Sequence, residues 1–277
     1  MTKHADDEPP SNPWRAETDH RLDLLERAAA AAGWDLSDPS EPPDDPPADP
    51  FTQVFEVDFT RADSPDTWLY NGLRNPDQGP RWKGNVEPTT EDEATFLRLH
   101  SRPVTEDTPI DGGYVIKAGE WASAGIGIKD NDLTYGAVEL EARSPWPTVG
   151  TRFAALLWPT DVKWPAAEID YLEAGGDKPY QDRHQYKISN WRLQDGKPAH
   201  DEQVIPCDLT TWHLFRTEWT PDLIRFLVDG VEVWRVTEHV PSGPMYAACQ
   251  TAQEWAGEKT PGALDVRGWR LYEWKPE

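Results

Sequence analysis

From Phe51 onward, short runs of apolar, β-branched and aromatic residues alternate with turn signals, and this pattern limits the fold more than any other feature. Phe153–Trp158 is a continuous apolar run with the length of a buried strand. Asp229-Gly230 separates Ile224–Val228 from Val231–Val236, which is a strong hairpin signal. The pattern predicts one all-β domain over residues 51–277, with Trp158 in its core.

Residues 1–50 have a different composition. They contain 13 acidic residues against four Lys or Arg, and nine Pro. Within the window of about residues 15–32, Leu22, Leu25, Ala29 and Ala32 recur at helical spacing, which predicts a short helix over Glu17–Ala32. Residues 35–50 are rich in Pro and Asp and read as a disordered acidic linker. The helix is a candidate docking element for a protein partner; the alternative is that it packs on its own sandwich.

Three acidic residues, Glu168, Asp170 and Glu173, lie within six positions. Like charges this close cannot all ionise freely, so their pKa values must separate. Ile169, Tyr171 and Leu172 between them favour a strand over an acidic loop.

Strand geometry predicts how these acids face. Glu168 and Asp170, two apart, share a face, whereas plain alternation turns Glu173 away. One extra residue, a β-bulge, would return Glu173 to that face. The two Glu carboxyls could then approach to about 5–5.5 Å, the separation of a retaining glycosidase. The alternative is an acidic strand that faces solvent.

This segment resembles the signature of the family 16 glycoside hydrolases in its bulged form, Glu-x-Asp-x-x-Glu. The resemblance covers roughly residues 51–275. Four further blocks resemble the family in the same order: Tyr135–Arg143, Trp212–Asp222 with Phe226–Gly230, Pro241–Gln250, and Trp269–Tyr272. The resemblance implies a jelly-roll β-sandwich of the concanavalin A-like type, with a cleft on its concave face.

The resemblance also implies residue roles. Glu168 would be the nucleophile, Glu173 the general acid/base, and Asp170 the residue between them. The candidate substrate-binding residues are Trp164, His184, Tyr186, Trp191 and Gln250. Many family members bind a structural calcium through an Asp in the last strand. Arg267 stands at that position here, with Asp265 two residues away. We therefore expect no cofactor and no metal.

Composition narrows the partners and substrates. The net charge of −23 disfavours nucleic acid, anionic membranes and strongly anionic polysaccharides. Neutral β-glucans or galactans fit better, and 15 Trp residues supply aromatic faces on which sugars stack. No stretch is long enough to span a membrane. The two cysteines, Cys207 and Cys249, are expected to be free thiols.

The polar, acidic N-terminus shows no signal peptide. Localisation stays open between the cytoplasm, non-classical export and a virus particle. Three functions are compatible with the sequence: a retaining glycoside hydrolase acting on neutral β-linked polysaccharide, a transglycosylase, and a non-catalytic carbohydrate-binding or virion decoration protein on the same fold. All three acids are present, and a binding protein has no need of them, which favours the enzyme.

Overall fold

A computed structural model describes residues 50–57, 59, 66–73, 79–175, 180–253 and 258–276. These residues belong to the unit Asp49–Glu277. The helix and acidic linker predicted for the N-terminal 50 residues lie outside the described residues, apart from Pro50.

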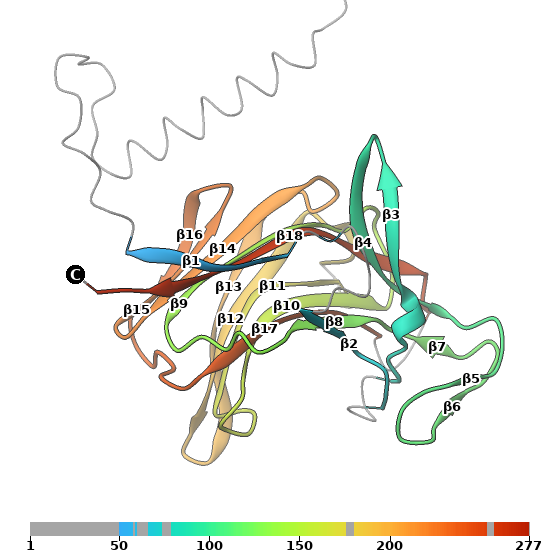
Figure 1. Ribbon diagram of the computed structural model, residues 1–277, viewed down its shortest axis with the longest axis horizontal. Coiled ribbons are helices and arrows are strands. Elements are labelled where there is room, and N and C mark those ends of the chain that lie inside the picture. The colour runs from blue at the N-terminus through green and yellow to red at the C-terminus, as the bar shows by residue number, and fades with distance from the viewer. Residues whose placement is uncertain are drawn as a thin grey trace, which may run out of the picture. The chain divides into compact units, whose positions relative to one another are not determined.

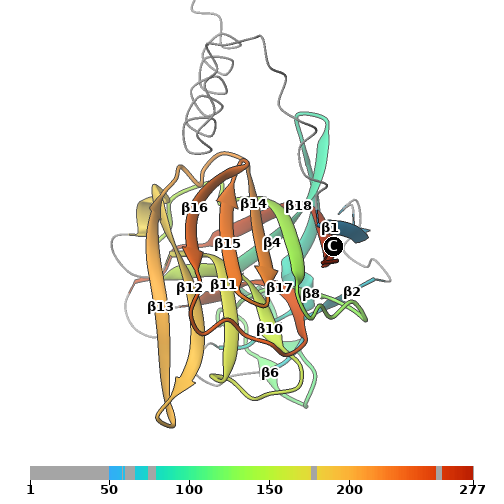
Figure 2. The same ribbon diagram turned by 90° about the vertical axis from the view of Figure 1, so that its left-hand side faces the viewer.

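Two antiparallel sheets stack into a sandwich (Figure 1, Figure 2). The nine-stranded sheet has a seven-strand path in the order β16 (Val231–Val236), β15 (Leu223–Val228), β14 (His213–Thr220), β9 (Gly136–Arg143), β18 (Gly262–Trp274), β4 (Ala94–Pro103) and β3 (Val86–Glu91). Off this path, β1 (Phe51–Val57) pairs with β18, and β7 (Trp121–Ala122) pairs with β4.

The seven-stranded sheet positions the site. Its order is β13 (Lys197–Pro206), β12 (Gln185–Gln194), β11 (Ala167–Gly175), β10 (Thr151–Pro159), β17 (Met245–Gln253), β8 (Gly125–Ile128) and β2 (Thr67–Leu69). A two-stranded sheet, β5 (Thr108–Pro109) with β6 (Val115–Ile116), and the 3₁₀ turns η2 (Lys83–Asn85) and η3 (Tyr180–Asp182) complete the described elements. The prediction of an all-β jelly-roll sandwich is confirmed.

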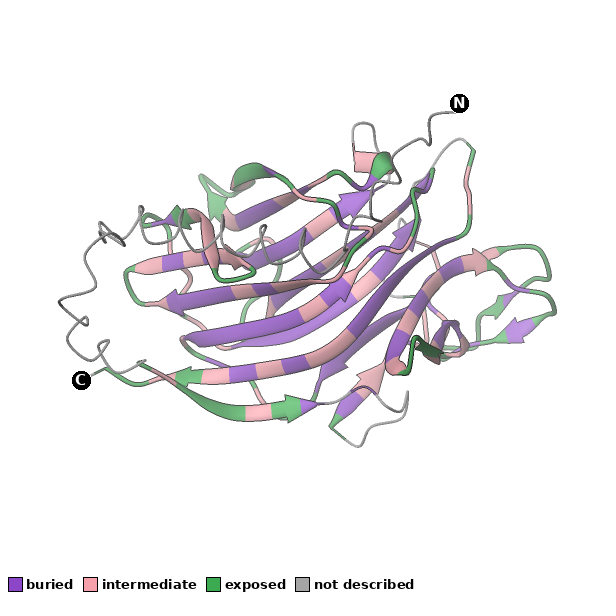
Figure 3. Ribbon diagram, turned by 90° about the horizontal axis from the view of Figure 1, so that it is seen from above, coloured by how far each residue is buried: buried purple, intermediate pink, exposed green. Residues whose placement is uncertain are grey.

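The main core lies between the two sheets. Trp219 and Trp269 on the nine-stranded sheet and Phe153 on β10 are fully buried there. Figure 3 shows buried residues along the middle of the strands and exposed residues toward their ends and in the loops. Because side chains alternate along a strand, the remaining side chains of the seven-stranded sheet lie on its opposite face, outside this core.

Local predictions are confirmed in several places. Strand β16 matches its predicted run at every residue, and β15 begins one residue before its predicted run, at Leu223. Asp229 and Gly230 both have positive φ, at 50° and 84°, as a type I′ hairpin turn requires. Cys207 and Cys249 are free thiols, the latter buried. No helix among the described residues has the length and apolarity needed to cross a bilayer.

Asp265 on β18 is fully buried beneath two arginines. The Nε and Nη2 of Arg98 donate to its carboxylate at 2.7 and 2.8 Å, and Nε of Arg143 donates at 2.9 Å. Arg267 pairs with Glu141 and lies 4.3 Å from the Trp212 ring centroid. Guanidinium groups already neutralise the carboxylates of Asp265 and Glu141, so this cation-rich cluster does not fit a calcium ion.

We predict that Asp265→Asn destabilises the protein by about 3–5 kcal/mol, because it leaves two guanidinium groups without their buried counter-charge. The free energy of unfolding in urea measures the loss. Glu91→Gln is the matched control. Glu91 contacts the same two arginines but its side chain is 42% exposed, so we expect a loss below about 1 kcal/mol. Equal losses in the two variants would contradict this assignment.

Candidate active site

Strand β11 contains the predicted bulge. Asp170 pairs with Ser189 of β12, and Glu173 pairs with Lys187, so three steps along β11 face two steps along β12. On the other side, Asp170 pairs with Leu156 and Leu172 with Ala155, which makes Tyr171 the extra residue. Ile169, Tyr171 and Leu172 therefore all enter the core. The three acids emerge on the opposite face.

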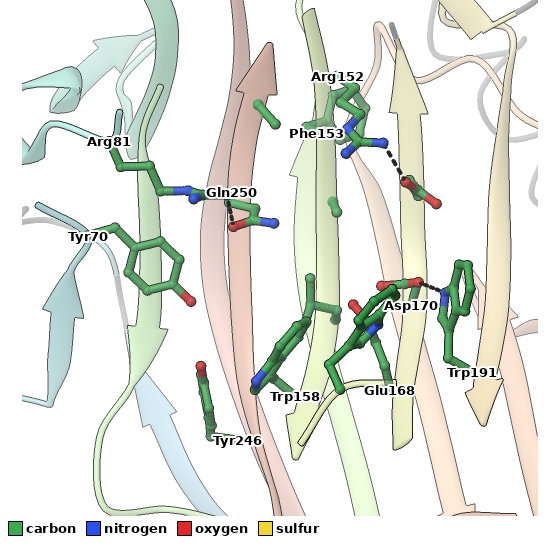
Figure 4. A pocket seen from close by; sticks show the side chains of 15 residues that line it. Tyr70, Arg81, Arg152, Phe153, Trp158, Glu168, Asp170, Trp191, Tyr246 and Gln250 are labelled. Atoms are coloured by element: carbon green, nitrogen blue, oxygen red, sulfur yellow. Dashed lines mark hydrogen bonds and ion pairs between the residues drawn. The ribbon is translucent and has the colours of Figure 1, made fainter. Parts of the chain in front are cut away.

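That face is a cleft of about 620 Å³. Its lining residues come from strands and loops far apart in the sequence (Figure 4): Tyr70, Arg81, Arg152, Phe153, Ala154, Leu156, Trp158, Trp164, Glu168, Asp170, Glu173, Trp191, Tyr246, Gln250 and Ala252. The volume is in the usual range for ligand sites. The lining combines aromatic walls with a few polar groups, as a sugar-binding cleft requires.

Glu168 and Asp170, two residues apart on β11, are both buried, 8% and 4% exposed. Asp170 accepts hydrogen bonds at Oδ2 from Ser189 Oγ (2.7 Å) and Trp191 Nε1 (2.9 Å). Burial, and then the negative charge of Asp170, raises the pKa of Glu168. Burial, and then the charge of Glu173, raises the pKa of Asp170 to about 7.

Glu173 has a different environment. Its side chain is 20% exposed, and its carboxylate lies 3.1 Å from Lys187 Nζ and 3.6 Å from Arg152 Nη1. It is thus the most accessible of the three acids and the one that faces cations. The contrast between a buried pair and a separate third carboxyl gives the site two kinds of acidic group.

Trp164 lies in the loop between β10 and β11 and is 46% exposed, although it borders the cleft. Its ring centroid lies 5.7 Å from that of Trp191 on β12. The ring of His200 on β13 packs on Trp191 from 4.1 Å, so the aromatic wall continues to the edge of the sheet.

The far end of the cleft is lined by Tyr70 and Arg81, which follow β2 in the chain, and by Tyr246 and Gln250 of β17. Arg81 Nη2 donates to Gln250 Oε1 at 2.7 Å, and Tyr70 and Tyr246 point their hydroxyls toward each other (Figure 4). The Gly-rich strand β8 supports this wall. A Cβ added at Gly125 would lie 2.2 Å from the Tyr70 ring, so only glycine leaves room for it.

The structure brings together six of the eight candidate site residues and leaves out His184 and Tyr186. Tyr186 is 1% exposed and packs edge-on against Phe215 in the core. It is five residues from Trp191 in the same strand, so the two must face opposite sides of the sheet. His184 precedes β12, is 65% exposed, and lies 3.7 Å from Asp208 instead of at the cleft.

Sequence reasoning missed several lining residues, and it was wrong about Trp158. Trp158 is partly exposed and lines the cleft with Arg152 and Leu156, whereas Ala155 and Leu157 of the same strand pack in the core. Strand β10 is apolar on both faces, so periodicity could not assign its sides. The one usable signal was Arg152, a charged residue two positions before the cleft-lining Ala154 and so on the same face of β10. No sequence signal marked Tyr70 or Arg81 as residues of the cleft.

Metal ligation has no support in the described ranges. Among these residues, no group of three or more His, Cys, Asp or Glu side chains is placed to hold a metal ion. The carboxyl groups of the site can transfer protons and attack as nucleophiles, and its aromatic rings can stack on a ligand.

Comparisons with known proteins agree with this geometry. A curated β-glucanase from Rhodothermus marinus is 25% identical over 199 residues, which is 65% of this chain and 63% of that protein. The chain thus spans less than two thirds of the length of that relative. A family 16 endo-glucanase from Bacteroides ovatus, solved in complex with G4G3G-2F-DNP, superposes with a TM-score of 0.63 at 12% identity, covering 78% of this chain and 99% of that one.

The catalytic domain of an endo-1,3-β-glucanase from Thermotoga petrophila has a TM-score of 0.60 at 20% identity, covering 82% and 99% of the two chains. The model of the family "Glycosyl hydrolases family 16" matches residues 92–267, which contain the bulged strand, the three tryptophans that line the cleft and Gln250. This chain belongs to glycosyl hydrolase family 16.

Proposed function

We propose that this protein is an endo-acting, retaining glycoside hydrolase that cleaves neutral β-glucans. The observation that supports this most strongly is the bulge in β11, which presents Glu168, Asp170 and Glu173 on one face of an aromatic-walled cleft. The names of the β-glucanase relative and of the endo-glucanase structures support β-glucan as the substrate class.

The two Glu residues divide the chemistry between them. Glu168 attacks the anomeric carbon, while Glu173 donates a proton to the departing glycosidic oxygen. Water then enters, Glu173 removes its proton, and the bond between sugar and Glu168 breaks with net retention. The partial exposure of Glu173 suits the residue that meets leaving group and water, and the burial of Glu168 suits the one that stays covered by the sugar.

The walls of the cleft suit an uncharged chain of sugars. Trp158, Trp164 and Trp191 offer ring faces near the carboxyls, and Tyr70, Tyr246 and Gln250 offer hydrogen-bonding groups at the far end. Sugar C–H faces stack on aromatic rings, and sugar hydroxyls pair with such polar groups. The acidic net charge of −23 disfavours polyanionic polymers.

We predict that the wild-type protein releases reducing sugar from laminarin or mixed-linkage β-glucan, and that Glu168→Gln lowers the rate at least about a thousandfold without loss of folding. Circular dichroism and thermal melting serve as the folding control. Binding of these polymers without release by either protein would refute the proposed hydrolase and favour a carbohydrate-binding protein.

Azide separates the roles of the two Glu residues. With an activated aryl β-glycoside, Glu173→Ala plus azide should yield a β-glycosyl azide, because azide attacks the covalent intermediate without needing a base. Glu168→Ala plus azide should yield the α-azide, because azide then replaces the missing nucleophile. NMR of the anomeric proton distinguishes the products. Exchange of the two outcomes would reverse the assignments.

Asp170 should cost the protein stability at neutral and higher pH. Its pKa is raised to about 7, so the folded state holds the proton more tightly than the unfolded state. Asp170 therefore causes no loss of stability below about pH 4, where it is protonated in both states. The free energy of unfolding then falls as the pH rises through about 7 and the buried carboxyl ionises.

We accordingly predict that Asp170→Asn, which cannot ionise, raises the free energy of unfolding by at least about 1 kcal/mol at pH 8 while it lowers activity. At pH 4 wild type and variant should be equally stable. Urea titrations at the two pH values measure this difference. A variant that is less stable at pH 8 than wild type would contradict the assignment.

A further inference from the structure

Arg81 is a buried cation in the wall of the cleft. It lines the cleft but is only 2% exposed. Its backbone forms isolated β-bridges with Gly72 and with Ser123. Its guanidinium lies over the Tyr70 ring, 5.7 Å from the centroid. Contacts with two other segments of the chain therefore fix the place of this guanidinium.

The hydrogen bond from Arg81 determines how the amide of Gln250 is turned. Arg81 Nη2 donates to Gln250 Oε1 at 2.7 Å. A guanidinium carries only donors, so the atom of the amide that it meets has to be the oxygen, because the opposite orientation would set donor against donor. The NH₂ group of Gln250 therefore points away from Arg81, and Figure 4 shows it directed toward the middle of the cleft.

Gln250 lies in the same cross-strand row as Glu173. Gln250 pairs with Ala154 of β10, and Ala154 pairs with Glu173 of β11. Two strand spacings place the Cα atoms of Gln250 and Glu173 roughly 10 Å apart. Ala154 lines the cleft between them and has a small side chain. A ligand that contacts both polar side chains can therefore cross β10 without meeting a bulky residue in this row.

Aromatic rings surround the same end of the cleft. Trp68 packs edge-on against Tyr70 and Tyr246, with ring centroids 5.4 and 5.5 Å apart. Both tyrosines line the cleft together with Gln250. This end thus combines aromatic surface with an amide of defined orientation, which is the combination that fixes a sugar ring in place.

We propose that Gln250 determines specificity by donating N–H hydrogen bonds to an oxygen atom of a neutral sugar, and that Arg81 is the positioning residue that orients it. The proposal rests on the proposed function, whose substrate chain occupies this row. The acceptor side of the amide is used within the protein, so its donor side faces the ligand. Donation from Arg81 to Oε1 also polarises the amide and strengthens its N–H groups as donors.

The proposal is tested by binding without turnover. The Glu168→Gln protein, which lacks the proposed nucleophile, is titrated calorimetrically at pH 7 with laminarihexaose and with a mixed-linkage β-glucan hexasaccharide, and the tighter ligand is used. In this background, Gln250→Glu keeps the shape and the oxygen that faces Arg81 but replaces the NH₂ group by oxygen. Gln250→Met removes both groups and adds no charge. We expect the Kd to rise about tenfold in both variants.

Thermal stability distinguishes a contact with the ligand from a structural contact. Gln250→Glu gives the Arg81 guanidinium a carboxylate partner, so its melting temperature should equal or exceed that of the background protein. Gln250→Met takes one acceptor away from Arg81, so its melting temperature should fall by about 2–4 °C. If Gln250 served only to hold Arg81, affinity would follow stability and Gln250→Glu would bind normally. That result would overturn the proposal.

Substitution of Arg81 tests its positioning role. Arg81→Met allows the amide of Gln250 to turn, so the Kd should rise about threefold to tenfold through the cost of ordering it again. Arg81→Lys still carries a donor and should recover most of the affinity. Unchanged affinity in Arg81→Met would refute this role. The side-chain ¹⁵N–H₂ signals of Gln250, identified by their absence in Gln250→Glu, test the contact without altering Arg81. They should shift when the oligosaccharide is added, and unchanged signals would overturn the proposal.

Gln194→Glu is the matched control. Arg192 Nη2 donates to Gln194 Oε1 at 3.4 Å, so the same substitution adds the same charge beside an arginine. Gln194 is exposed and lies three residues from Trp191, hence on the other face of β12. The Kd of this variant should equal that of the background protein. A tenfold loss here as well would assign the effect to net charge and overturn the proposal.

The same measurements separate two kinds of failure. If wild type releases no sugar from β-glucans but the binding results are as expected, the proposed hydrolase fails and the role of Gln250 stands. If wild type and Gln250→Glu hydrolyse β-glucan with the same KM, the role of Gln250 fails and the hydrolase stands. Failure of the Glu168→Gln protein to bind either oligosaccharide would also overturn the role of Gln250.

Discussion

One extra residue in β11, Tyr171, determines what the cleft contains. Without the bulge, strict alternation would place Leu172 beside Asp170 and direct Glu173 toward the core. With it, Tyr171 and Leu172 both enter the core, and Glu173 returns to the face that carries Glu168. The apolar core on one side and the acidic cleft on the other are thus two results of the same one-residue shift in register.

The acidic groups of the cleft are unfavourable for folding, but the proposed reaction requires them. Glu168 and Asp170 are both buried, so burial and mutual repulsion destabilise the state in which both are ionised. Two donors on β12, Ser189 and Trp191, offset part of that cost by hydrogen-bonding to Asp170. The packing of the core between the sheets, which is rich in buried aromatic residues, has to offset the rest of this cost.

The aromatic rings of the cleft take part in that electrostatic arrangement as well as in its shape. Trp191 is a wall residue that also donates a hydrogen bond to Asp170, and its ring lies beside that of Trp164. At the other end, Arg81 packs over Tyr70 and holds Gln250, so the polar wall is itself ordered by contacts within the protein. Sugar binding and control of the acids therefore depend on the same side chains.

The sequence by itself determined the class of the fold, the Asp229-Gly230 hairpin and the position of the acidic triplet, because these depend on local patterns of two to ten residues. It also predicted the bulge, since three acids interleaved with apolar residues fit a strand only with an extra residue. The roles of the individual acids came from a family resemblance, and they stand as a proposal.

Only the tertiary structure decided which face each side chain occupies and what it meets there. Trp158 was expected in the core and lies in the cleft, because β10 is apolar on both faces. His184 was a candidate for the site and lies elsewhere, because its place depends on where β12 begins. The pairing of Trp191 with Asp170, 21 residues apart, and of Arg81 with Gln250, 169 apart, requires the sheet to bring distant segments together.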